Sequence, residues 1–96
     1  MISTDVYVRK SESVAYRDIA TGGVLLSLAD GQYHNVNELG RQIWGLLGDG
    51  TVGELVSELR THFADPPAEI EQDVIEFLEG LLERRLVEVS EHAQGD

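Results

Sequence analysis

The chain has 96 residues, which is enough for one domain with a modest hydrophobic core and too few for two. It contains no cysteine, so disulfides, thiolate metal sites and a cysteine nucleophile are excluded. Eighteen acidic residues outnumber seven basic ones, and a domain with a formal charge of −11 would be repelled by nucleic acid.

The first 36 residues have the pattern of β-strands. Apolar runs typical of strands occur at residues 6–8, 14–19 and 24–28. The pair Asp30-Gly31 favours a two-residue type I′ hairpin, after which residues 32–36 return antiparallel to the preceding strand. We therefore predict a three-stranded antiparallel meander whose last strand, residues 32–36, lies at an edge of the sheet.

From residue 37 onward the apolar residues recur with the period of a helix. Asn37 is placed to cap a first helix from residue 38 to about 47. Thr51 and Glu54 have the spacing of a capping box, which predicts the start of a second helix. The consecutive prolines at 66 and 67 interrupt the chain, and the third helix is predicted from about residue 67 to 85.

The third helix has a broad apolar face. Its apolar positions form two adjacent stripes, made of Ile70, Val74, Phe77 and Leu81 and of Ile75, Leu78, Leu82 and Leu86. Together they cover about 180° of the circumference, whereas a surface helix that packs against one core needs only about 100°. We therefore expect part of this face to be available for a partner.

The predicted fold class is α+β, similar to a winged helix-turn-helix: a three-stranded antiparallel sheet followed by three helices. Residues 86–89 are expected to add a small strand, and residues 90–96 to form a flexible tail. We predict a single domain over residues 1–96 with its core at about residues 5–89. No run is apolar enough to span a membrane and no signal peptide is recognisable, so a cytoplasmic protein is expected.

The sequence has no constellation of catalytic residues. Its serines lack the glycine-flanked elbow of hydrolases, and its glycine pairs lack the spacing of a phosphate-binding loop. The three histidines are scattered without metal-ligand spacing. A DNA reader is also excluded, because the predicted third helix carries six acidic residues against Arg84 and Arg85. We expect a protein that binds a partner without a metal or cofactor, and not an enzyme.

Two segments carry a resemblance to a known family. Residues 24–44, VLLSLADGQYHNVNELGRQIW, and residues 74–87, VIEFLEGLLERRLV, resemble the PqqD-like proteins, the precursor-peptide recognition elements of ribosomally made, modified peptides. The resemblance covers about residues 5–89. The chain departs from the family pattern at Ser27, where Asp is common, at Val36, where Leu is usual, and at Arg85, which replaces a glycine.

The resemblance implies a function in peptide recognition. A free-standing chain of this size looks most like the standalone member of lasso-peptide pathways, in which the leader segment of the precursor adds as a strand beside the third strand. The leader would lie in the cleft between that strand and the third helix. Its partners would be a leader protease and an ATP-dependent cyclase, with no nucleic acid and no membrane. Two alternatives stay open: a peptide chaperone for a radical enzyme, as in PQQ biosynthesis, or a generic acidic protein-protein interaction module.

The predicted site combines the edge strand with the face of the third helix. An edge strand offers unpaired backbone groups to an added strand, and the helix offers apolar walls. The leader-peptide contacts predicted on this basis are Leu28, Gln32, Tyr33, His34, Asn35, Val36, Glu69, Ile70, Asp73, Val74, Phe77 and Leu78. Catalytic residues and metal ligands are not expected.

Overall fold

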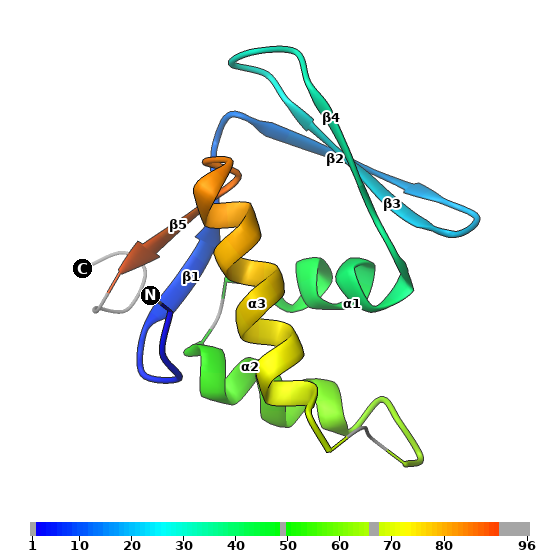
Figure 1. The fold of residues 1–96 in the computed structure, drawn as a ribbon, viewed down its shortest axis with the longest axis vertical. Helices are drawn as coiled ribbons and strands as arrows, with labels where there is room; N and C mark the ends of the chain where they lie inside the picture. The colour runs from blue at the N-terminus through cyan, green and yellow to red at the C-terminus, as the bar shows by residue number, and fades with distance from the viewer. Residues whose placement is uncertain (1, 49, 66–67, 91–96) are drawn as a thin grey trace.

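The computed structural model describes residues 2–48, 50–65 and 68–90. In chain order its elements are β1 (Tyr7–Lys10), β2 (Val14–Ile19), β3 (Gly22–Ser27), β4 (Tyr33–Val36), α1 (Glu38–Leu46), α2 (Val52–Arg60), α3 (Ile70–Glu83) and β5 (Val87–Ser90). The predicted α+β fold class is confirmed, since the antiparallel sheet β2–β3–β4 is followed by three helices (Figure 1).

The three-stranded sheet has β3 at its centre and β4 at one edge, as predicted. The prediction of a two-residue hairpin is wrong, because the connection between β3 and β4 is longer. Ser27 N donates to Gln32 O at 2.9 Å, and Gly31, with φ of 73°, donates from its N to Ser27 O at 2.7 Å. Asp30 Oδ1 accepts from Gln32 N at 3.1 Å, so this aspartate stabilises a wider loop through its side chain. Leu28 consequently lies in the loop.

The first strand pairs with the last in a separate two-stranded sheet. β1 is antiparallel to β5, with Val8 opposite Val89, and Figure 1 shows the two strands side by side. Arg9 Nη2 and Glu88 Oε1, 2.6 Å apart, form an ion pair across them. The strands predicted at residues 6–8 and 86–89 overlap with β1 and β5, but their pairing across the length of the chain was not predicted.

The helix starts follow the predicted capping. Asn37 Oδ1 accepts from Gly40 N at 2.8 Å at the start of α1. Thr51 and Glu54 form the reciprocal hydrogen bonds of a capping box at the start of α2. α3 is shorter than predicted; the predicted start at Pro67 lies outside the described residues, and the helix ends at Glu83.

The apolar face of α3 is buried more completely than the sequence analysis predicted. Ile70, Val74 and Leu78 are fully buried, together with Leu25 of β3 and Leu59 of α2. α3 packs against both α2 and β5, so the helix buries much of its wide apolar face within this molecule. Phe77, Ile75 and Leu82 flank the buried stripe and stay partly exposed.

Candidate functional site

The open edge of β4 displays backbone hydrogen-bonding groups. Residue pairs in an antiparallel ladder alternate between those that exchange backbone hydrogen bonds and those that do not. Because Ser27 N donates to Gln32 O, the register makes His34 a hydrogen-bonded partner of β3. The N–H and C=O groups of Tyr33 and Asn35 therefore point away from β3, toward the edge.

A groove runs along this edge and separates β4 from α3. The part of the groove toward the end of α3 is a cavity of about 480 Å³. It is lined by all four residues of β4 and, on the α3 side, by Glu76, Phe77, Gly80, Leu81 and Arg84. The groove thus combines exposed strand backbone, to which an extended peptide can add as a strand, with a helical wall that can contact its side chains.

A second cavity of about 430 Å³ continues the groove toward the start of α3. It is lined by Asn37, Leu39, Gly40, Ile43, Asp73, Glu76 and Phe77, and so shares Glu76 and Phe77 with the first. From residue 73 to residue 84 a helix rises about 16 Å. An extended peptide covers that distance with about five residues.

Phe77 lies where the two cavities of the groove meet, and α1 approaches its ring closely. A Cβ atom at Gly40 would lie 2.9 Å from Phe77 Cε1 and 3.0 Å from Val36 Cβ. Only glycine leaves room there for the aromatic ring between α1 and α3. The position of the ring therefore depends on Gly40.

The predicted contact residues fall into three groups. Six of the twelve line the groove: Tyr33, His34, Asn35, Val36, Asp73 and Phe77. Three are exposed but do not line it: Leu28 and Gln32 in the hairpin loop, and Glu69 at the start of α3. The remaining three, Ile70, Val74 and Leu78, have no exposed surface, so the structure places them in the core beneath the groove. Peptide contact by any of the twelve stays a prediction.

The groove also includes residues that sequence analysis did not select, above all Gly80, Leu81 and Arg84. Gly80 had a detectable signal, since a glycine inside a helix costs about 1 kcal/mol relative to alanine and often marks a close approach. Arg84 lies beyond the end of α3, and the sequence analysis considered it only as a candidate for binding DNA.

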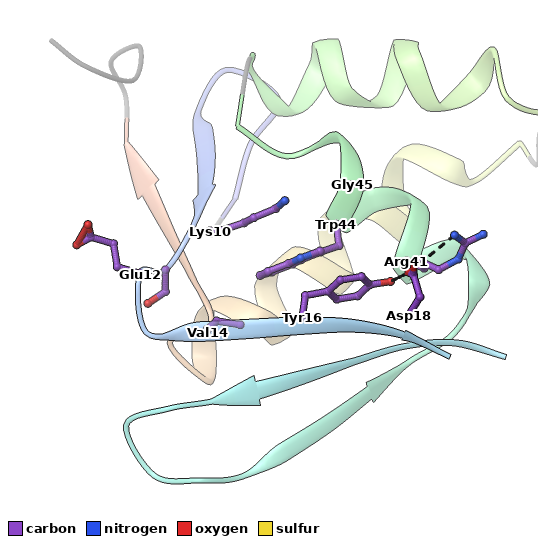
Figure 2. A pocket seen from close by; sticks show the side chains of 9 residues that line it. Lys10, Glu12, Val14, Tyr16, Asp18, Arg41, Trp44 and Gly45 are labelled. Atoms are coloured by element: carbon purple, nitrogen blue, oxygen red, sulfur yellow. Dashed lines mark hydrogen bonds and ion pairs between the residues drawn. The ribbon is translucent and has the colours of Figure 1, made fainter. Parts of the chain in front are cut away.

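A third cavity, of about 630 Å³, is lined by residues of α1, of β2, of the segment between β1 and β2, and by Lys10 at the end of β1 (Figure 2). Tyr16 stacks on Trp44 with ring centroids 6.1 Å apart, and Lys10 Nζ lies 5.2 Å from the centroid of the same indole. The Tyr16 hydroxyl donates to Asp18 Oδ1 at 2.6 Å. Burial of the ring and this hydrogen bond to a carboxylate raise the pKa of Tyr16 to about 12.

The described part of the chain has neither a metal-binding cluster nor a membrane-spanning helix. No group of three or more histidine, aspartate and glutamate side chains in residues 2–48, 50–65 and 68–90 is arranged to hold a metal ion. Among the same residues, no helix has the length and apolar character needed to cross a membrane.

Comparison with known proteins assigns the chain to a family. The family described as Coenzyme PQQ synthesis protein D (PqqD) matches residues 22–87, more than half of the chain. The chain belongs to the PqqD family. The matched residues run from the first residue of β3 through β4 and all three helices to the start of β5, and so include the whole groove. No curated protein matches the chain.

A solved structure is similar to this PqqD-family chain over most of its length. It is TbiB1 in complex with the TbiA(beta) leader peptide, with a TM-score of 0.73 and 29% sequence identity. The match covers 83% of this chain and 94% of TbiB1. The similar fold is therefore one that, in TbiB1, binds a leader peptide.

Proposed function

We propose that this protein is a non-catalytic adaptor that binds the leader segment of a ribosomally made precursor peptide. The leader adds as a strand to the free edge of β4 and lies in the groove between β4 and α3. The observation that carries the proposal is the open edge. The backbone N–H and C=O groups of Tyr33 and Asn35 point away from β3, beside a groove whose two cavities meet at Phe77. Family membership and the leader-bound TbiB1 support it.

The groove offers enough interaction for useful affinity. Burial of two or three apolar leader side chains around Phe77 and Leu81 contributes roughly 1.5–3 kcal/mol each. Backbone hydrogen bonds to β4 add about 1 kcal/mol each. Association and ordering of the peptide cost roughly 4–15 kcal/mol. A Kd of about 1 μM corresponds to about −8 kcal/mol, and we expect this affinity or tighter with an association cost near the lower end of that range.

The bound leader would then be presented to a leader protease and an ATP-dependent cyclase, in the manner of lasso-peptide pathways. A second candidate is a peptide chaperone for a radical enzyme of PQQ biosynthesis, which the description of the matching family favours. The neighbouring genes distinguish these two candidate functions. A short precursor with a protease and a cyclase supports the first, and a radical enzyme in their place supports the second.

Strand addition is tested by a proline at Asn35. The Asn35 N–H faces the open edge, so Asn35→Pro removes a donor that β4 offers to the added strand and leaves the ladder to β3 intact. Fluorescence anisotropy with a labelled leader segment encoded beside the gene should show at least tenfold weaker binding, because the hydrogen bond to the leader is lost and the proline ring occupies the edge at which the leader would pair.

Asn35→Ala is the matched control, because it keeps the N–H and removes only the side chain. It should bind nearly as well as the wild type, and urea unfolding should show that both variants are folded. Binding by Asn35→Pro at wild-type strength would refute strand addition at β4. The adaptor function itself would be refuted if the wild-type protein bound none of the neighbouring leader segments.

A further inference from the structure

The two ends of the β4–α3 groove carry opposite charge. Arg84 borders the cavity at the Tyr33 end, and Asp73 borders the cavity at the Asn37 end. Glu76 borders both cavities, so the acidic part of the groove extends to its centre. On the strand side the titratable side chains that line the groove are Tyr33 and His34. About 16 Å of helix separates the residues at the two ends.

Arg84 is held over the groove by the backbone of Gly80. Its Nη1 donates to Gly80 O at 3.1 Å, and a Cβ atom at Gly80 would lie 3.3 Å from the same nitrogen. A larger residue at position 80 would therefore crowd the guanidinium. That group has five N–H donors, and the bond to Gly80 uses one, which leaves donors to bind a carboxylate of a peptide in the groove.

The other end suits a cation. Asp73 is exposed, and Glu76 Oε2 accepts one hydrogen bond from Gln72 Nε2 at 3.1 Å. A carboxylate accepts several hydrogen bonds, so both side chains keep acceptors for an ammonium or guanidinium group. The net charge of −11 adds a general attraction for basic ligands, but that attraction does not depend on the order of charges within the ligand.

We propose that the groove selects leader segments by their charge order: a basic side chain, then apolar residues, then an acidic side chain, read from the N-terminus. β4 runs from the Arg84 end toward the Asp73 end, and an antiparallel partner runs the opposite way. Antiparallel pairing is the somewhat more stable arrangement and the one used throughout this sheet. This inference rests on the proposed function, since it describes the ligand of the same groove.

The test uses two peptides of identical composition. Each contains the apolar centre of the neighbouring leader segment; one has two lysines before it and two glutamates after it, and the other has these flanks exchanged. In about 20 mM NaCl, where screening acts over roughly 20 Å, the lysine-first peptide should bind about tenfold tighter. Because the two peptides have the same total charge, the general attraction of an acidic protein for basic ligands cancels in the comparison of their affinities.

A charge-exchanged protein supplies the matched control. In the double variant Asp73→Lys, Arg84→Glu both changes are at exposed positions, and the glutamate-first peptide should become the tighter ligand. Equal affinity of the two peptides for the wild type, or a preference for the glutamate-first peptide, would overturn the inference. If that happens while an uncharged version of the peptide still binds and Asn35→Pro abolishes that binding, the proposed function stands and only the charge-order inference fails. Loss of all peptide binding would instead count against the proposed function.

Discussion

At the scale of single residues, Arg85 occupies a conformation that suits glycine. Its φ is 61°, in the left-handed region, where a Cβ atom crowds the backbone. Arg85 N donates to Leu82 O at 3.0 Å and Leu86 N donates to Leu81 O at 2.9 Å, the pattern of a Schellman motif after α3. The sequence has arginine where the PqqD-like pattern has glycine, and the backbone keeps the geometry of the glycine.

Arg85→Gly is therefore expected to stabilise the protein. Relative to Arg85→Ala, which removes the same charge but keeps a Cβ atom, it should raise the free energy of unfolding by about 1 kcal/mol. Urea unfolding followed by circular dichroism measures the difference. Equal stability of the two variants would contradict a strained backbone at this position.

Individual site residues were predictable where local pattern determines their position. Tyr33 and Asn35 follow from alternation along a strand that was already assigned to an edge. The full burial of Ile70, Val74 and Leu78 was not predicted, because a helical stripe shows which residues share a face but not how many neighbours cover it. In this fold α2 and β5 together cover that face.

At the scale of elements, α1 fits closely against β4 and α3 on one side only. A Cβ atom at Gly40 would clash with Phe77 and Val36, at distances of 2.9 and 3.0 Å. A Cβ atom at Gly45 would have no neighbouring atom of the described residues within 4 Å. Both glycines lie within the same helix, so they share a backbone conformation and differ in their surroundings.

The two glycines should respond to alanine in opposite directions. Gly45→Ala should stabilise the protein by up to about 1 kcal/mol through helix propensity. Gly40→Ala gains the same propensity but overpacks the interface, at a cost of roughly 1–3 kcal/mol, so we expect net destabilisation. Thermal unfolding of both variants tests this, and a Gly40→Ala protein as stable as Gly45→Ala would show that Phe77 moves aside freely.

Element boundaries were predicted best where side chains cap the backbone. Asn37, Thr51 and Glu54 are local signals, and α1 and α2 begin where these residues place them. The hairpin between β3 and β4 was predicted wrongly because Asp30 also supports a wider loop through its own side chain. A dipeptide preference does not distinguish these two loops.

At the scale of the whole molecule, the pairing of β1 with β5 was beyond sequence analysis. Val8 and Val89 lie at opposite ends of the chain, and no local pattern specifies which short strands pair across that separation. The acidic charge, in contrast, is fully visible in the sequence. The chain carries it in a molecule with principal extents of 36 × 36 × 20 Å.

This charge should make stability depend on salt. The screening length is about 30 Å at 0.01 M salt, close to the size of the molecule, and about 8 Å at 0.15 M. Repulsion among the acidic side chains is stronger in the compact state than in the expanded unfolded chain, so screening favours folding. Between these two concentrations of NaCl at pH 7, we expect the free energy of unfolding to rise by about 1 kcal/mol or more.

The matched control for the salt effect is a protein with fewer acidic side chains away from the groove. Glu71 and Glu83 are exposed and do not line the β4–α3 groove. The double variant Glu71→Gln, Glu83→Gln should show a smaller rise in its urea midpoint over the same salt range, because fewer like charges are screened. An unchanged salt response would mean that NaCl acts on stability by a route other than the net charge.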